Sequence, residues 1–453
     1  MAAEKDIIVA LELATTSIRA MAGQRLSDGT MQVLAFAEEN SSHCIRKGII
    51  DNIDKTTQAI SRILGQIGLQ LGQTISRVYV GLGGQSLHSR KNRIQRTFEG
   101  RTQIANSLID QLMDTNRGMV YTDSEILEVV PQEYRVGNRT ISDIVGMQAE
   151  QLEANFLNII ARNSLAENIE KCINRAGVDI AELLITPVAL GDSILNAGEK
   201  RSGCALVDLG ADTTTVSIYT NNILRKLVVL PLGSNNVTMD IANCLTTEAD
   251  EAEVLKLKYG RAIVEAPDSL QGNTIKISHG REISEAKLCE IIESRYEEIL
   301  RNVWAQIEDE SDKLTSGIIF TGGGAQIRSL VEAFHCIMNS DRQIRVVKGM
   351  PADVCLASGV FVPDNGRTSN ILSLLIHGEQ NCISRQTPTV EEQPAQESDE
   401  SGTKNTPALS DSGTGKDEET KPKTGEETKQ DKKQPIKGFF AILKKALTED
   451  DGE

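Results

Sequence analysis

Two short segments combine a carboxylate with small and hydroxyl side chains, the residue types that hold phosphate groups and hydrated cations. The apolar run 7–11 leads into residues 12–16 (ELATT), and the apolar run 204–207 leads into residues 208–214 (DLGADTT). Each segment predicts a tight β-hairpin with an acid at the end of its first strand. Two such hairpins facing each other could bind phosphates through amides and hydroxyls, and Mg²⁺ through the carboxylates. Taken singly, each is also typical of ordinary turns.

Two further segments carry weaker signals for the same chemistry. Residues 321–326 (TGGGAQ) follow an apolar run, and three glycines let the backbone approach a phosphate or a planar group closely. Strand-to-helix turns use glycine in any case. On the helix-like stretch 249–259, Glu253 and Lys256 lie at i, i+3 on one face. They could hydrogen-bond a ribose, or they could form a solvated helix pair of small energetic value.

The elements that must position these segments alternate between strand-like and helix-like patterns. Ile60, Ile63 and Ile67 follow one helix face within 54–72, and a similar face runs through 284–309. Strand-like apolar runs occupy 7–13, 31–37, 76–83, 204–210, 214–220, 227–233 and 316–324. Such mixing of strands and helices predicts layers of α/β structure.

The composition argues against several other classes of protein. With 453 residues, 39% of them hydrophobic, the chain is long enough for two or more domains. A net charge of −16 argues against a nucleic-acid binder that relies on overall charge. The eight cysteines have no paired spacing, which predicts reduced thiols in a cytosolic protein. The first residues carry acids, unlike a signal peptide, and no run approaches the roughly 18–20 apolar residues of a membrane span.

The last 75 residues change character twice. Residues 379–434 predict a disordered acidic linker, because the charged, Ser, Thr, Pro and Gly residues of 391–434 leave too little apolar surface to offset the entropy of ordering. Residues 435–448 place apolar side chains on one helix face, with lysines around it. This pattern predicts an amphipathic helix that binds anionic membrane lipids. The membrane-binding side chains predicted for it are Ile436, Phe439, Phe440, Leu443, Lys444 and Leu447.

The order of these segments resembles the actin-like ATPase superfamily, and within it the FtsA family of bacterial cell-division proteins. The order is an acid-ended hairpin, a second acid-ended hairpin, a Glu-x-x-Lys helix and a Thr-Gly-Gly-Gly turn. The more specific motifs are VVPQEY at 129–134 and GSNNVTMDIA at 233–242, together with the amphipathic segment behind an acidic linker. The resemblance covers nearly the whole chain except 379–434.

The resemblance implies a two-lobed actin-like α/β fold, a duplicated RNase-H-like architecture in which one small subdomain is relocated. A first lobe core is expected at 1–86 and 164–198, with the relocated subdomain at 87–163. A second lobe core is expected at 199–230 and 302–378, with a small partner-docking subdomain at 231–301.

The resemblance also implies a cleft that binds ATP. It assigns nucleotide binding to Glu12, Thr15, Thr16, Asp208, Gly210, Thr213, Gly233, Glu253, Lys256, Gly322, Gly323 and Gly324. Asp208 is expected to hold Mg²⁺ through water. The family's first hairpin usually reads Asp-Ile-Gly-Thr, so Glu12 and Ala14 depart from it, and Asp212 adds negative charge where a γ-phosphate would lie. We therefore expect weakened binding.

We expect no catalytic residue and slow or absent hydrolysis. In catalytic relatives a carboxylate or amide near the start of the helix after ANFLNIIA polarises the attacking water. Here the stretch reads Arg162-Asn163-Ser164-Leu165, with no carboxylate before Glu167. The alternative function is a kinase or another ATP-hydrolysing enzyme of the same superfold, which the altered hairpins and the basic tail argue against.

The function implied by the resemblance is that of a peripheral membrane protein of the division site. It would tether the tubulin-like protein FtsZ to the cytoplasmic face of the plasma membrane, assemble into actin-like filaments and recruit later division proteins. Arg295 matches a family arginine at the FtsZ dock. Without the resemblance, we would interpret Arg295 as a solvated surface arginine.

Overall fold

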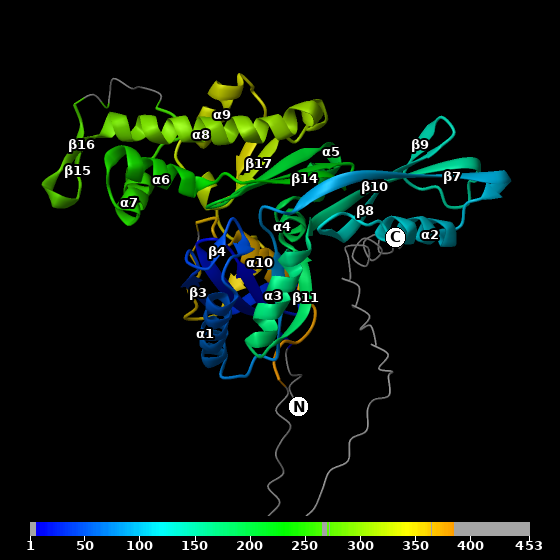
Figure 1. Cartoon of the computed structure of the whole chain (residues 1–453), viewed down its shortest axis with the longest axis horizontal. Helices are drawn as coiled ribbons and strands as arrows, with labels where there is room; N and C mark the ends of the chain where they lie inside the picture. Colours follow the sequence, from blue (N-terminus) through cyan, green and yellow to red (C-terminus); the bar gives the residue numbers. More distant parts are fainter. Residues whose placement is uncertain (1–5, 265–269, 271, 364, 385–453) are drawn as a thin grey trace, which may run out of the picture. The chain divides into compact units, whose positions relative to one another are not determined.

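The computed structural model describes residues 6–264, 270, 272–363 and 365–384 (Figure 1). The predicted amphipathic helix at 435–448 and all but the first residues of the predicted linker lie outside this part of the chain. None of the helices in the described part is both long enough and apolar enough to cross a bilayer.

A six-stranded sheet forms the first lobe, in the order β11-β6-β1-β2-β3-β19 (Figure 1). Its strands are β1 (Ile7–Leu13), β2 (Ser17–Arg25), β3 (Met31–Asn40), β6 (Arg77–Leu82), β11 (Asp179–Ile185) and β19 (Val354–Leu356). The five central residues of β1 are all buried, so both faces of this strand are covered. Such an unbroken apolar run is typical of a strand that pairs in parallel, as β1 does with β6.

Two pairs of helices cover this sheet. Helices α1 (Ile53–Leu71) and α3 (Asn163–Arg175) pack on each other and on β2, β3 and β11, while α4 (Thr186–Ile194) and α10 (Ser369–Ile376) pack on each other and on β1, β2 and β6. Helix α1 begins where the Asn52 side chain accepts a hydrogen bond from the Lys55 N–H, and it ends at Gly72 with φ 66°. The short strands β4 (Ile45–Arg46) and β5 (Ile49–Ile50) pair beside it.

A second, nine-stranded sheet has the order β18-β17-β12-β13-β14-β7-β10-β8-β9. Its first five strands are β12 (Cys204–Leu209), β13 (Thr214–Thr220), β14 (Ile223–Leu230), β17 (Ile318–Thr321) and β18 (Ile344–Val346). The helices that follow them in the second lobe are α5 (Ala197–Ser202), α6 (Ser234–Leu245), α7 (Ala249–Tyr259), α8 (Glu285–Ile307) and α9 (Leu330–Met338). Shorter elements are the hairpin β15 (Thr274–Lys276) and β16 (Glu282–Ser284), and the 3-10 turns η2 (Ser278–Gly280), η3 (Glu308–Lys313) and η4 (Gly323–Gln326).

The other four strands of this sheet belong to the inserted segment that follows β6. They are β7 (His88–Gln103), β8 (Ser124–Val136), β9 (Arg139–Ile141) and β10 (Gln148–Arg162), and helix α2 (Asn106–Arg117) packs on them. These elements bury a hydrophobic cluster of their own, and Leu127, Val130, Leu157 and Ile159 also join the larger core that includes Leu224 and Leu227 of β14. The ladder between β14 and β7 contains one registered pair, Val228 with His88.

A group of polar contacts supports this narrow junction. The Arg225 guanidinium on β14 pairs with the Glu133 carboxylate on β8 and donates to Gln132 Oε1 at 3.0 Å. Gln132 Nε2 in turn donates to the Leu224 carbonyl at 3.0 Å. The VVPQEY motif therefore supplies two polar side chains at this junction, to which the hydrogen bond from the Leu227 N–H to the Ser89 hydroxyl at 2.8 Å adds a third.

Two of the predicted boundaries differ from the structure. Strand β19 and helix α10 belong to the first lobe, although the prediction placed residues 302–378 in the second. Strand β19 pairs in parallel with β3 and extends the first sheet, and α10 packs its apolar face on β1 of the same sheet. The other domain limits stay predictions.

The second difference concerns residues 379–384, which were predicted to begin the linker but are held on the first lobe. The Tyr79 hydroxyl accepts hydrogen bonds from the N–H groups of Glu379 and Gln380, at 3.0 and 2.8 Å. The Cys382 N–H donates to the Ile7 carbonyl at 2.7 Å, and the Ser76 N–H donates to the Cys382 carbonyl at 2.9 Å. This end segment therefore fastens on the starts of β1 and β6.

Candidate nucleotide-binding site

Three charged side chains lie side by side on the first sheet at the end of the first hairpin. Glu12 on β1 is the cross-strand partner of Arg19 on β2, and Arg19 is the partner of Glu38 on β3. Arg19 reaches Glu12 Oε2 and Glu38 Oε1, each at 3.0 Å, and is only 5% exposed. Burial alone would raise the pKa of Glu38, but the charges of Arg19 and Arg367 and the hydrogen bonds from Ser17 and Arg19 together outweigh it, so this pKa lies below its usual value.

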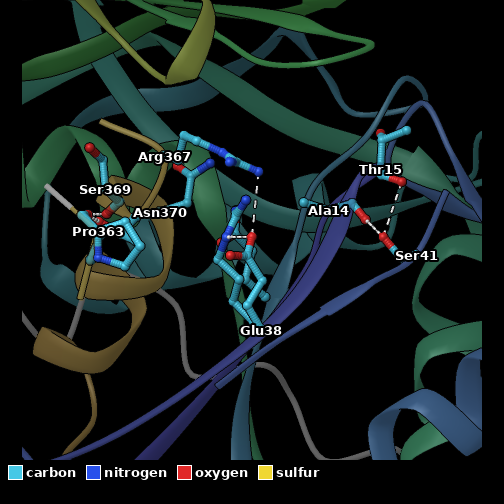
Figure 2. Close-up of polar contacts among 12 residues, drawn as sticks. Ala14, Thr15, Glu38, Ser41, Pro363, Arg367, Ser369 and Asn370 are labelled. Carbon is cyan, nitrogen blue, oxygen red and sulfur yellow. Dashed lines mark hydrogen bonds and ion pairs between the residues drawn. The ribbon is translucent and has the colours of Figure 1, made fainter. Parts of the chain in front are cut away.

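A second arginine reaches the same carboxylate. Arg367, just before α10, places a guanidinium nitrogen 3.6 Å from Glu38 Oε1, and Figure 2 shows the two side chains facing each other. The stem of Arg367 lies so close to Gly323 that a Cβ there would be 3.0 Å from its Cγ. The Arg367 side chain is 48% exposed, whereas Arg19 is buried. The cluster of Glu12, Arg19 and Glu38 is therefore open to solvent on the side where Arg367 lies against the glycine turn.

The first turn is braced by residues of the next segment. The Ser41 hydroxyl donates to the Ala14 carbonyl at 2.7 Å and to the Thr15 carbonyl at 3.1 Å (Figure 2). The Gly48 N–H donates to the Thr15 hydroxyl at 3.1 Å. Ala14 does not have a positive φ, so this turn closes without a left-handed residue at that position. The weakened binding expected from the loss of a glycine here stays a prediction.

In the second hairpin, Asp208 lies between the two lobes. Asn370 on α10 donates to its Oδ2 at 3.1 Å. Burial and the charge of Glu12 raise the pKa of Asp208 to about 6, against the opposing effects of Asn370 and Arg19. Gly322 has a φ of 88°, and a Cβ there would lie 2.4 Å from Asp208 Oδ1. The glycine turn thus packs directly on the second acid-ended hairpin, where only glycine fits.

Asp212, in the second turn, is also placed between the lobes. Its carboxylate accepts hydrogen bonds from the Lys47 N–H at 3.3 Å and from Asn235 Nδ2 at 3.0 Å. Gly233 begins α6 against the same turn, because a Cβ there would lie 2.3 Å from the Ala211 carbonyl oxygen. The Gly210 N–H donates to the Thr213 carbonyl at 2.9 Å, which closes the turn.

The Glu253 and Lys256 pair is not the solvated helix pair that was one of its two interpretations. Lys256 is only 5% exposed, and its ammonium contacts Glu253 Oε2 at 2.6 Å, Thr238 Oγ1 at 2.8 Å and the Ser234 carbonyl at 3.1 Å. These three acceptors match the three donors of an ammonium group. Burial lowers the pKa of Lys256, partly offset by Glu253. Lys256 therefore holds α6 against α7 and orients Glu253, which is 43% exposed.

Arg295 lies on α8 in the second lobe and is not a free cation. Its Nε contacts Asp240 Oδ2 at 2.5 Å, a second nitrogen contacts Asp240 Oδ1 at 3.1 Å, and it also pairs with Glu298. The interpretation as an unpaired, solvated arginine is therefore wrong. A partner's carboxylate would have to share this guanidinium with Asp240.

The structure brings most of the predicted nucleotide residues to one place, and it adds others that sequence reasoning missed. Gly322 packs directly on Asp208, which also accepts a hydrogen bond from Asn370. Glu12 lies nearby and is held by Arg19. The two turns beside these residues are formed by Thr15, Thr16, Gly210, Thr213 and Gly233. The missed residues are Arg19, Glu38, Ser41, Asn235, Arg367 and Asn370. Writing out the register of the first hairpin would have paired Glu12 with Arg19, but no local pattern indicates the other five.

Comparison with known proteins shows to which family this chain belongs. The family model "Cell division protein FtsA" matches residues 205–361, and the model "SHS2 domain inserted in FTSA" matches residues 84–160. The FtsA of Porphyromonas gingivalis is 31% identical over 350 residues, which cover 75% of this chain and 72% of that protein. The FtsA of Pseudomonas aeruginosa is 29% identical over 356 residues, which cover 76% and 84%.

A solved structure supports the fold independently. The PilM-PilN type IV pilus biogenesis complex contains a chain that superposes with a TM-score of 0.58 at 14% identity, covering 82% of this chain and 97% of that one. Identity this low bears on the fold alone. The actin-like fold class with its inserted domain is confirmed, and the chain belongs to the FtsA family of cell-division proteins.

Proposed function

We propose that this chain binds an adenine nucleotide between its two lobes. The observation that carries the proposal is the contact of the glycine turn with the second hairpin, where Gly322 lies against the Asp208 carboxylate. A side chain at position 322 would collide with the Asp208 carboxylate, so the turn can pack on the second hairpin only with glycine there. Exposed Glu253 offers an acceptor for ribose hydroxyls, and Lys256 acts by orienting it.

Hydrolysis is proposed to be slow or absent. Helix α3 begins after Arg162 and has no acidic residue in its first turn. Glu167 lies farther along the helix and pairs with Lys171 at 3.5 Å. The start of this helix therefore offers no carboxylate that could act as a base on a water attacking a phosphate.

Mg²⁺ was expected at Asp208 through water, and the donor set does not fit it. Glu12, the second carboxylate that would face such a cation, is bound to Arg19. Within the described residues, no group of three His, Cys, Asp or Glu side chains is arranged to hold a metal. Asp208 alone is a weak ligand set for an ion that favours several oxygens in near-ideal geometry.

At the level of the cell, we propose that the chain tethers FtsZ to the cytoplasmic face of the plasma membrane at the division site. Family membership supports this, as does the amphipathic segment 435–448. Self-assembly into filaments and recruitment of later division proteins belong to the same proposal. On α7 the large apolar side chains of Val254 and Leu257 are exposed, and they offer surface for such contacts.

Sedimentation with liposomes tests this function. The full chain should carry FtsZ into the pellet with anionic vesicles, and Phe439→Glu should leave both proteins in the supernatant, because a charge on the apolar stripe opposes insertion. Thr448→Glu, at the end of the segment, is the matched control and should still sediment. Sedimentation of Phe439→Glu with vesicles would contradict the anchor, and a pellet lacking FtsZ would contradict the tether.

A further inference from the structure

A loop of the first lobe, at Lys47 and Gly48, directs two consecutive backbone N–H groups toward the turns of the two hairpins. The Gly48 N–H donates to the Thr15 hydroxyl of the first turn at 3.1 Å, and the Lys47 N–H donates to the Asp212 carboxylate of the second turn at 3.3 Å. Lys47 and Gly48 both have a left-handed backbone, with φ of 50° and 72°. Consecutive backbone N–H groups in such a turn are suited to binding anions.

This loop is held in place by the segment that follows β6. A Cβ on Gly48 would lie 2.6 Å from the Gly84 Cα, so the two backbones touch and only glycine fits there. The Gln85 N–H also donates to the Lys47 carbonyl at 3.0 Å. The first lobe itself therefore fixes the direction in which the loop presents its N–H groups.

Asp212 supplies the anion that this loop binds in the structure. Its carboxylate also accepts a hydrogen bond from Asn235 Nδ2 of the second lobe at 3.0 Å, so one acid is bound by donors of both lobes. A phosphate held between the two turns would need the same kind of donor, because phosphate oxygens accept from backbone N–H groups. The carboxylate and a phosphate cannot share these donors, since two anions in a partly buried site repel each other more strongly than in water.

The charges around Asp212 do not offset this competition. The guanidiniums of Arg19 and Arg367 pair with acids of the first sheet, and neither contacts Asp212. The acids gathered at the site outnumber these two cations, because they are Glu12, Glu38, Asp208 and Asp212. Each further phosphate of a ligand therefore adds negative charge to a site that already has an excess of it.

We propose that Asp212 occupies the position of the terminal phosphate, so that this site favours ADP over ATP. The inference rests on the proposed nucleotide site and adds which nucleotide that site selects. With its ribose at Glu253 and its phosphates running toward the turns, the ligand reaches the Lys47 loop with its last phosphate. ATP must displace the carboxylate from Lys47 and Asn235, whereas ADP binds with these contacts intact.

Calorimetric titration of the full chain with unlabelled ADP and ATP, in buffer containing Mg²⁺, tests the inference. The wild-type Kd for ATP should exceed that for ADP by about threefold or more, because the carboxylate opposes the additional phosphate. Asp212→Gly should lower the Kd for ATP by about tenfold, through loss of the competing anion, and that for ADP by less than about threefold. Asp212→Asn keeps an oxygen acceptor without the charge and should lie between wild type and Asp212→Gly.

Asp51→Asn is the matched control, because it removes an exposed acid from the same segment of the first lobe, where Asp51 pairs with Arg46 at 3.8 Å. It should change neither Kd. Amide exchange reports the contact itself: in ligand-free Asp212→Gly the Lys47 amide should exchange faster than in wild type, and ATP, but not ADP, should slow it again.

Equal tightening toward ADP and ATP in Asp212→Gly would indicate a general charge effect and overturn the inference alone. A wild-type chain that binds ATP as tightly as ADP would do the same. Absence of binding of both nucleotides to wild type and to Asp212→Gly would overturn the nucleotide site and the inference with it.

Discussion

The carboxylates of the two hairpins look equivalent in the sequence, yet their surroundings differ. Glu12 has a cross-strand arginine at 3.0 Å, whereas Asp208 has the amide of Asn370 and no direct cation. The negative charge of Asp208 is therefore incompletely compensated, and its pKa rises from the ordinary 3.8 to about 6. At neutral pH the charged Asp208 should therefore lower the stability of the folded protein and increase its affinity for the ligand.

Asp208→Asn should stabilise the ligand-free protein at pH 7.5 and weaken nucleotide binding. The folded protein binds this proton more tightly than the unfolded chain, so the stability that Asp208 contributes falls as pH rises from about 4 to about 6 and then stays level. A shift of about two pKa units corresponds to about 2–3 kcal/mol. Urea denaturation of wild type and variant at pH 5 and 7.5 measures this difference in the free energy of unfolding.

The buried Oδ1 of Asn370 has no hydrogen-bond partner, and the new amide can donate to it. Asp179→Asn, on edge strand β11, is the control and should leave the pH dependence unchanged. A variant at 208 that is less stable than wild type at pH 7.5 would contradict the assignment of the raised pKa.

At the scale of single residues, sequence reasoning found the groups that a family motif carries and missed those that only the fold brings together. Gly322 and Asp208 belong to local patterns. Arg367 and Glu38 are more than 300 positions apart and meet because α10 returns to the first sheet. Long-range pairing of this kind leaves no spacing signal in the chain.

At the scale of elements, the surface of α6 and α8 is where a partner's tail is proposed to dock. Arg295 joins the two helices through Asp240, so the dock is a paired charge rather than a bare one. A peptide carboxylate can bind the Arg295 guanidinium only by weakening its ion pair with Asp240, so the loss of that pair reduces the free energy of peptide binding. The pairing therefore lowers affinity for an acidic tail and keeps Arg295 in a fixed orientation.

Arg295→Glu should weaken binding of the FtsZ tail peptide by about tenfold or more, since loss of a desolvated pair typically costs about 2–5 kcal/mol. Asp240→Asn should have the opposite effect and strengthen it, because Arg295 is released. Fluorescence anisotropy with the labelled peptide measures both variants.

Arg301→Glu serves as the control on the same helix, where Arg301 pairs only with Glu297 at an exposed position. It should change peptide affinity little. Equal binding by wild type and Arg295→Glu would remove Arg295 from the dock, and equal losses at 295 and 301 would indicate a general charge effect.

The type of several elements in the two lobes followed from the sequence, whereas the long strands β7, β8 and β10 of the inserted segment did not. The apolar run 7–13 and the helix-like stretch 249–259 coincide with β1 and α7, and the stretch 54–72 agrees with α1 within one residue at each end. Periodic patterns indicate long elements reliably because many side chains share one face. Strand β19 has only three residues and was missed, since its pairing with β3 rather than its own pattern makes it a strand.

At the scale of the whole molecule, the inserted segment joins the second lobe through one narrow junction. The first and second lobes each have extensive sheets and cores, whereas β7 meets β14 through one registered pair. The Arg225 contacts with Glu133 and Gln132 add to the apolar packing of Val130 and Leu157 with Leu227 at this junction. The attraction of Arg225 lowers the pKa of Glu133, so this contribution is present at neutral pH and is lost as pH falls through that pKa.

Arg225→Ala should loosen the inserted segment and destabilise the protein by about 1–3 kcal/mol, less than a fully buried pair because both side chains keep some exposure. Hydrogen exchange of the amides in β7 and β8 should quicken, while exchange in β1 stays as in wild type. Arg93→Ala, which breaks an exposed pair with Glu153 inside the segment, is the control. Uniform quickening throughout the chain would contradict a local role.

The fastening of residues 379–384 on the first lobe has a mechanical consequence. Tension applied to the chain beyond Ser384 reaches the body first through the hydrogen bond from the Ser384 N–H to the Thr74 carbonyl, at 3.0 Å, and then through the Cys382 contacts with Ile7 and Ser76. Strands β1 and β6 lie side by side in parallel, and Glu12 lies one residue before the end of β1. A pull along the chain would thus load a strand that carries the Glu12–Arg19 pair near its far end. The point of attachment and the proposed nucleotide site lie at opposite ends of β1.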